Sequence, residues 1–232
     1  MYANRRRCAK RDQPGSGDRA ARALRLLRCP LATPFGSYTL RRLDLPWRSL
    51  LLALSALIVF AISGPLPQAL LLDRSTAVAT QPWTLITAHL VHTGGDHLLW
   101  DLLGLLLVGL VFEPLLRGRL WLVLAVGALA IDGLVLSGLA GFERYAGLSG
   151  LINAVAGAGL VQALRARDRL AAGFGLLVVG KVLFESVTGG TLLTNTAWPP
   201  ALSAHIIGLL SGAVTALAVG RTEPTPARSV SE

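Results

Sequence analysis

A serine between two glycines is the strongest chemical candidate in this chain. Ser149 stands in Gly147-Leu148-Ser149-Gly150, inside a charge-free run over residues 145–164. Small neighbours leave the hydroxyl accessible, and the free N–H groups of a first helical turn can bind an oxyanion. These residue types predict a nucleophile with an anion site beside it. The alternative is that the small residues only let membrane helices pack closely.

His205 is the residue that we expect to act as the base for Ser149. Gly208 and Gly212 follow it by three and seven residues and share its helix face. Gly157 lies two turns below Ser149 in the same way. Small residues on both faces would let the two helices approach until hydroxyl and imidazole form a hydrogen bond. Since no third acidic partner is evident, the spacing predicts a Ser-His dyad.

His89, His92, His97 and Asp101 form a second polar cluster earlier in the chain. Zinc is commonly bound by His and Asp. However, a His-Glu-x-x-His sequence is absent, and His92 and His97 are five residues apart, which places them on different helix faces. We therefore expect no metal and no other cofactor. An aspartyl protease would need two carboxylates such as Asp101 and Asp132, but neither follows a Tyr or a Gly-x-Gly.

The composition indicates a multi-pass membrane protein. Of the 232 residues, 53% are hydrophobic and 15% are charged, and the mean hydropathy is +0.57. The net charge of +9 does not indicate nucleic-acid binding, because twelve of the 22 basic residues fall within the first 48 positions, without interleaved aromatic residues. Membrane topology and anionic lipid headgroups explain these charges better. Cys8 and Cys29 lie in the same basic stretch and are expected to be free thiols.

The chain divides into a membrane domain and two tails. We expect residues 1–44 to form a basic, mostly disordered cytoplasmic tail, 45–221 a six-helix domain, and 222–232 a second short tail. This organisation predicts an all-α, polytopic membrane protein. The predicted spans are 50–62, 97–113, 119–140, 147–164, 170–188 and 201–220. We expect residues 65–96 to form a loop partly embedded in the outer leaflet.

Six spans bring both chain ends to one side of the membrane. Most arginines that flank the spans lie on that side, and only Arg74 and Arg144 lie opposite. By the positive-inside rule, we expect both termini in the cytoplasm and the protein in a bacterial inner membrane. His97, Ser149 and His205 then lie near the outer ends of their spans, so three reactive groups share one depth.

Five motifs occur in order between residues 45 and 220. They are Trp83-x-x-x-Thr87, His92-x4-His97-x3-Asp101, Glu113, Gly147-Leu148-Ser149-Gly150, and Ala204-His205-x-x-Gly208-x3-Gly212. In this order and spacing they resemble the rhomboid family of intramembrane serine proteases. Tyr145 before the serine motif, together with Lys181-x3-Glu185, resembles the rhombosortase branch of that family.

The resemblance implies a rhomboid-like helix bundle that hydrolyses peptide bonds within the bilayer. Ser149 would be the nucleophile, and His205 the general base and then the general acid. The backbone N–H of Ser149 and the side chain of His97 would bind the oxyanion. His92 would support His97, and Glu113 would be a structural hydrogen-bond acceptor. The substrates would be single-span membrane proteins that enter from the side.

Two positions depart from the family pattern. Asp101 stands where most rhomboids carry Asn, and Asn153 stands where many carry Tyr, so Asn153 is expected to affect how the base is held. Because an ionised Asp101 would repel an oxyanion, we expect it to be protonated and to donate a hydrogen bond. The alternative is an ionised carboxylate that accepts a bond from His97 and sets its tautomer. Lys181 and Glu185, four residues apart, are expected to form a structural salt bridge.

These residues are compatible with three functions. An active rhomboid-type serine protease leads, because both the serine and the histidine are present. The alternative is a catalytically inactive rhomboid-like protein that binds transmembrane helices without cutting them. A small transporter is disfavoured, since paired broken helices and inverted repeats are missing from the sequence.

Overall fold

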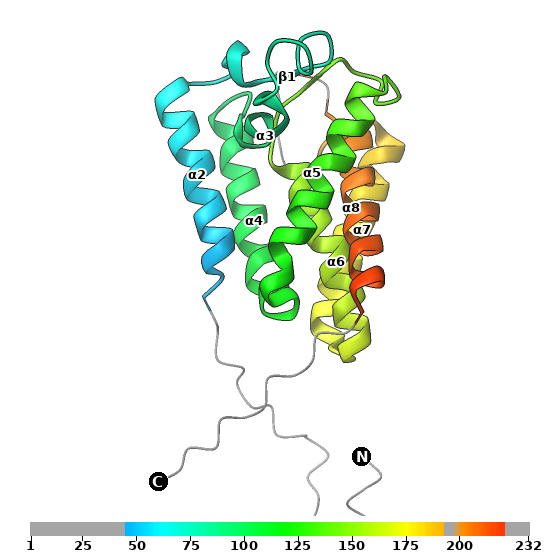
Figure 1. The fold of residues 1–232 in the computed structure, drawn as a ribbon. Coiled ribbons are helices and arrows are strands. Elements are labelled where there is room, and N and C mark those ends of the chain that lie inside the picture. The colour runs from blue at the N-terminus through cyan, green and yellow to red at the C-terminus, as the bar shows by residue number, and fades with distance from the viewer. Residues whose placement is uncertain (1–44, 193–197, 199, 221–232) are drawn as a thin grey trace, which may run out of the picture. The chain divides into compact units, whose positions relative to one another are not determined.

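The computed structural model describes residues 45–192, 198 and 200–220, and six long helices dominate that part of the chain (Figure 1). They are α2 (Trp47–Ser63), α4 (Gly95–Leu116), α5 (Leu120–Leu136), α6 (Ser149–Ala166), α7 (Arg169–Thr188) and α8 (Leu202–Val219). A short 3-10 turn, η3 (Arg117–Arg119), joins α4 to α5. The two predicted tails, with Cys8 and Cys29, lie outside the described residues.

The bundle confirms the predicted all-α, polytopic membrane fold. The helices α7 and α8 and the run from α4 to α5 are long and apolar enough to cross a membrane, and α2 is apolar but shorter, at 17 residues. The third span ends earlier than predicted, at Leu136 and not at Ala140. Glycines with positive φ, Gly138 at 78° and Gly141 at 82°, turn the chain there.

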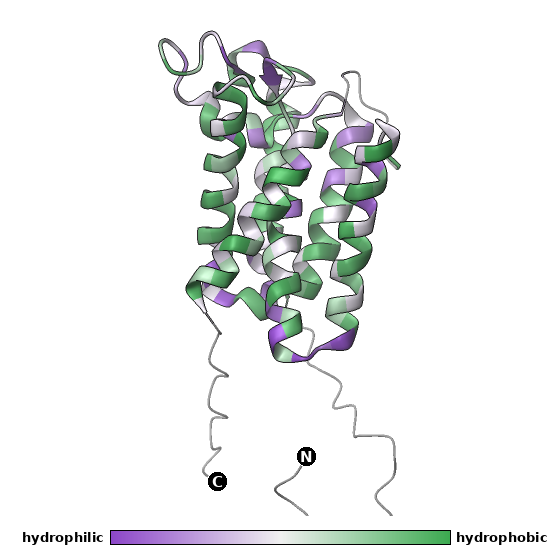
Figure 2. Ribbon diagram, turned by 90° about the vertical axis from the view of Figure 1, so that its right-hand side faces the viewer, coloured by the Kyte–Doolittle hydropathy of each residue, from purple (hydrophilic) through white to green (hydrophobic). Residues whose placement is uncertain are grey.

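Helix α6 occupies the centre of the bundle. It contacts α4, α5, α7 and α8, and twelve of its eighteen residues are buried. The surrounding helices expose large aliphatic side chains, among them Leu57, Leu177 and Val214. Most of the length of these helices is hydrophobic (Figure 2). Such faces are stable against lipid. The central helix therefore carries Gly and Ala, while its neighbours carry the lipid-facing Leu and Val.

Glycines let α6 and α8 cross in backbone contact. A Cβ added to Gly208 would overlap the carbonyl oxygen of Gly150, and one added to Gly212 would overlap that of Ala154. Gly157 on α6 meets the backbone of α8 in the same way. The close approach of these two helices, predicted from their small residues, is confirmed.

Helix α2 begins and α8 ends at the same end of the bundle (Figure 1). There the carboxylate of Glu113 accepts hydrogen bonds from the backbone N–H groups of Arg48 and Ser49, both at 3.0 Å. These N–H groups have no partner within α2, so Glu113 caps that helix from its neighbour. Arg165 donates to the carbonyl of Gly220 at 3.0 Å and ties the end of α8 to α6. Glu113 is thus the structural acceptor that was expected.

The connection between α2 and α4 covers the opposite end. It contains η1 (Gln68–Leu70), β1 (Leu72–Asp73), α3 (Thr84–Thr87) and η2 (Ala88–Leu90). The indole of Trp83 donates to the carbonyl of Ala69 at 2.7 Å, and the hydroxyl of Thr87 to that of Leu70 at 2.9 Å. The strand β1 pairs antiparallel with β2 (Arg144–Tyr145). This pairing anchors the segment that leads into α6.

Candidate active site

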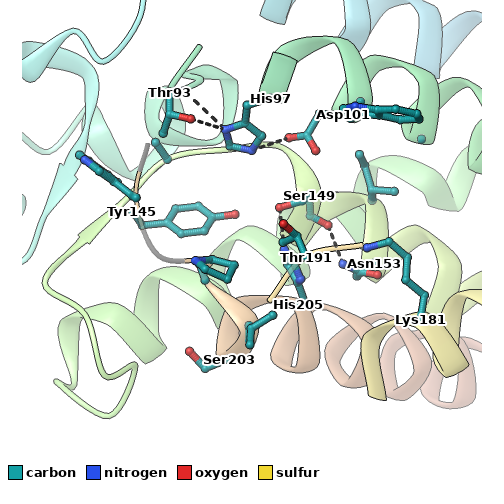
Figure 3. A pocket seen from close by; sticks show the side chains of 18 of the residues that line it. Thr93, His97, Asp101, Tyr145, Ser149, Asn153, Lys181, Thr191, Ser203 and His205 are labelled. Carbon is teal, nitrogen blue, oxygen red and sulfur yellow. Dashed lines mark hydrogen bonds and ion pairs between the residues drawn. The ribbon is translucent and has the colours of Figure 1, made fainter. Parts of the chain in front are cut away.

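Ser149 and His205 meet where α6 and α8 both begin. Ser149 is the first residue of α6, and His205 lies in the first turn of α8. Nε2 of His205 is 2.9 Å from Oγ of Ser149, which is hydrogen-bond distance (Figure 3). The imidazole is buried. The glycine crossing of the two helices brings these side chains into contact.

The turn before Ser149 is held by Tyr145. Its hydroxyl donates to the carbonyl of Gly147 at 2.9 Å, and the N–H of Gly147 donates to the carbonyl of Ala88 at 3.0 Å. Gly147 has a φ of +129°, and a Cβ there would lie 3.0 Å from Cε1 of His97. Burial raises the pKa of the Tyr145 hydroxyl, so this group remains a neutral donor. Only glycine fits at 147, which explains its place in the serine motif.

Asp101 is the centre of a buried polar cluster beside this turn. Its Oδ2 accepts a hydrogen bond from the N–H of Leu148 at 3.0 Å. The same oxygen is 3.2 Å from Nε2 of His92 and 3.4 Å from Nε2 of His97. All three polar side chains are buried. The carboxyl group of Asp101 therefore holds the backbone next to Ser149.

The hydrogen bonds of the two histidines indicate how protons are distributed in this cluster. The N–H of Thr93 is directed at Nδ1 of His97 at 3.4 Å, so this nitrogen accepts and Nε2 carries the proton toward Asp101. Nδ1 of His92 lies 3.1 Å from the carbonyl of Leu90 and must be a donor. Of the two roles considered for Asp101, the geometry therefore favours the carboxylate that accepts a hydrogen bond from His97 and sets its tautomer, and not the protonated donor.

Asn153 lies one turn below Ser149, but its contact differs from the expected one. Its Nδ2 donates to the carbonyl oxygen of Ser149 at 2.9 Å, within α6. Where the sequence suggested an influence on His205, the structure shows a hydrogen bond to the backbone of the serine.

Glu185 is a neighbour of His205 that residue spacing did not reveal. It lies on α7, is fully buried, and binds Nζ of Lys181 with both carboxylate oxygens at 2.7 Å, which confirms the predicted salt bridge. Its Oε2 is also 3.8 Å from Nδ1 of His205. The sequence did indicate that Lys181 and Glu185 face the protein interior, because charged residues in an apolar span usually do. The spacing of the two residues could not show which side chain of another helix they contact.

A cavity of about 910 Å³ adjoins these residues. Its walls come from α4, α6, α7, the start of α8 and the segment 140–146, and Ser149, His205, His97 and Asp101 supply polar groups. Pockets of this size accept drug-sized molecules or short peptide segments. Among the residues that the structure describes, no group of three or more His, Cys, Asp or Glu side chains is arranged to hold a metal ion.

Comparison with known proteins identifies the family. The family model described as "Rhomboid domain" matches residues 79–222, which is more than half of the 232-residue chain. The matched region contains Ser149, His205 and the cavity walls. No curated protein matches the chain. The family match and the bundle of apolar helices together show that this chain belongs to the rhomboid family.

Proposed function

We propose that this protein is an active intramembrane serine endopeptidase. Ser149 is the nucleophile and His205 the general base in this proposal. The observation that carries it is the 2.9 Å separation of Ser149 Oγ and His205 Nε2 on the wall of a large, mainly apolar cavity. A hydroxyl and an imidazole at this distance form the unit that activates serine nucleophiles.

In the proposed reaction, Oγ of Ser149 attacks the carbonyl carbon of the scissile bond while Nε2 of His205 takes the hydroxyl proton. The N–H at the start of α6 binds the oxyanion that forms, and the Nε2–H of His97 turns from Asp101 toward the same oxygen. The imidazolium then protonates the leaving amine, the C–N bond breaks, and an acyl-serine ester remains. Water, activated by His205, hydrolyses the ester and restores both residues.

The cavity supports a substrate that enters from the side. Its lining comes from both α4 and α7, and α6 with Ser149 lies between them. A single-span membrane protein is therefore the proposed substrate class. A helical peptide bond is shielded by its own hydrogen bonds, so the segment at Ser149 must unwind before attack.

Covalent labelling tests this function directly. A fluorophosphonate probe should label the purified, detergent-extracted protein and should not label Ser149→Ala. Ser203→Ala is the matched control, because Ser203 lines the same cavity and its hydroxyl only donates to the carbonyl of Ala140 at 2.8 Å. Labelling of Ser149→Ala at the native level would refute the assignment. A folded native protein that does not react would support the alternative, an inactive rhomboid-like protein that binds transmembrane helices.

We further propose that the protein belongs to the rhombosortase branch and processes C-terminal tails of surface proteins. Such a tail carries a Gly-rich stretch, one hydrophobic span and a basic end. Glycines make a helix easy to unwind, so a reporter with this tail should be cut near its glycines in cells that contain the protein. Equal cleavage of a poly-Leu span without glycines would contradict this specificity, and Ser149→Ala cells show the background.

Replacing Asp101 by Asn is expected to reduce the rate of substrate cleavage about tenfold or more, the usual effect of losing an orienting partner. The carboxyl oxygen accepts from Leu148 N–H and is within 3.4 Å of Nε2 of His92 and of His97, and an uncharged amide oxygen is a weaker acceptor for these groups. The measurement is kcat/KM on one reporter over a range of pH. Native or higher activity in Asp101→Asn would instead support a protonated Asp101 that acts as a donor.

The orientation with both termini in the cytoplasm is also a proposal, and the native cysteines test it. Both cysteines, Cys8 and Cys29, lie in the N-terminal tail, so a membrane-impermeant maleimide should label the protein only after spheroplasts are opened. A Val78→Cys variant without the native cysteines is the control, because Val78 is exposed in the connection at the opposite end. It should be labelled in intact spheroplasts. The reverse pattern would invert the topology.

A further inference from the structure

Glu185 is a buried carboxylate with an unusual set of neighbours. It lies on the otherwise apolar helix α7 and is fully buried. Its Oε1 accepts from Nζ of Lys181 at 2.7 Å and from the N–H of Leu192 at 2.8 Å. Its Oε2 binds Lys181 as well and is 3.8 Å from Nδ1 of His205. A salt bridge between Lys181 and Glu185 alone would not require the carboxylate to be fully buried or to face His205.

The second nitrogen of His205 has no hydrogen-bond partner in the part of the chain that the structure describes. This nitrogen, Nδ1, is buried. Buried polar groups without a partner are rare in folded proteins. For Nε2 to take the proton of Ser149, the neutral ring must carry its proton on Nδ1. This N–H therefore needs an acceptor, and Oε2 of Glu185 is the carboxylate oxygen beside it.

The separation of 3.8 Å is an ion-pair distance and is longer than a hydrogen bond. Catalytic hydrogen bonds are often long in the absence of substrate and shorten when it binds. Lys181 lines the cavity and contacts both carboxylate oxygens of Glu185 at 2.7 Å, so it holds the carboxylate from the cavity side. The carboxylate is thus held in place and directed at the ring.

We propose that Glu185 is a positioning residue for His205, so that the catalytic pair is extended to Ser149, His205 and Glu185. Its carboxylate attracts the N–H at Nδ1, keeps Nε2 free to face Ser149, and stabilises the imidazolium that forms when Nε2 takes the serine proton. The proton moves from Oγ of Ser149 to Nε2, and Glu185 neither gains nor loses one. Lys181 is the counterion of the carboxylate. This inference rests on the proposed protease function.

The rate of fluorophosphonate labelling tests the proposal in the full-length protein. Glu185→Gln keeps the size of the side chain and an acceptor for Leu192 but removes the charge. We expect its second-order labelling rate to fall about tenfold or more. Lys181→Met combined with Glu185→Gln removes both charges, so no unpaired lysine remains, and it should show the same loss. This double variant replaces the single one if the latter does not fold.

Glu113→Gln is the matched control. Glu113 is another buried carboxylate, but it caps α2 at the opposite end of the bundle. Its loss should lower the thermal midpoint and leave the labelling rate per folded molecule within about twofold, as expected for a group that makes no contact with the reacting atoms. Native labelling rates in the folded double variant would overturn the positioning role.

The tautomer of His205 supplies a readout that a merely structural role would not change. The chain has only four histidines, so ¹⁵N-histidine spectra with and without His205→Gln identify its ring signals. We expect the native ring to be protonated at Nδ1, and Glu185→Gln to shift this proton signal or move the proton to Nε2. An unchanged ring spectrum would contradict the proposal. If the tautomer depends on Glu185 but the native protein reacts with no probe, the positioning role stands and the protease function fails.

Discussion

Replacing Ser149 or His205 by alanine is expected to abolish proteolysis by the purified protein. Each change removes one half of a single proton-transfer unit, whose atoms are 2.9 Å apart. In serine proteases such losses reduce kcat by roughly four orders of magnitude or more. The double variant should be no slower than either single variant, because the remaining partner has no separate function. Cleavage of a membrane-anchored reporter in detergent measures the effect.

Both variants should remain folded, which thermal unfolding can check. Each removes a small number of atoms from a cavity wall and leaves the glycine contacts of α6 and α8 unchanged. Ser203→Ala should retain native cleavage and serves as the control for changes in the same wall. More than a trace of cleavage by either purified single variant would show that these two residues are not the catalytic pair.

Replacing Gly212 by alanine is expected to cause the largest loss of folded protein among conservative substitutions. The new Cβ would overlap the carbonyl oxygen of Ala154 and lie 2.9 Å from its Cα, and both atoms belong to the backbone of α6. Backbone atoms cannot move aside as a side chain can, so the helices must separate toward a normal contact of about 3.5–4.0 Å. Overpacking of this kind costs about 1–3 kcal/mol or more.

The same separation would disturb catalysis even in molecules that fold. The Ser149–His205 hydrogen bond spans these two helices, so a shift of α8 lengthens it. We expect a lower thermal midpoint and a reduced rate of probe labelling per folded molecule.

Gly133→Ala is the control, because Gly133 lies within α5 and its Cβ would meet no atom within 4 Å. Alanine is the better helix former by about 1 kcal/mol in aqueous helices, so this variant should be as stable as the native protein or more so. If Gly212→Ala behaves like Gly133→Ala, the close helix crossing is not what holds the site together.

The sequence alone determined the order of the apolar spans and the end of the bundle at which the reactive groups lie. The length of an apolar run sets the extent of a spanning helix, so residues near the same ends of two spans must share a level. Ser149 and His205 could be paired for this reason. Gly208 and Gly212 also indicated which face of α8 meets α6, because only small residues permit backbone contact.

Where two helices have no glycines to indicate their contact faces, only the tertiary structure decided which of their side chains meet. Whether Glu185 faces Lys181 alone or also His205 depends on the rotation of α7 about its axis. Likewise, Asp101 reaches the N–H of Leu148 only because α4 and the turn before α6 are placed together. The period of a helix defines the residues on each of its own faces and carries no information on a neighbour's rotation. That rotation results from many weak packing contacts along whole helices, which no short motif contains.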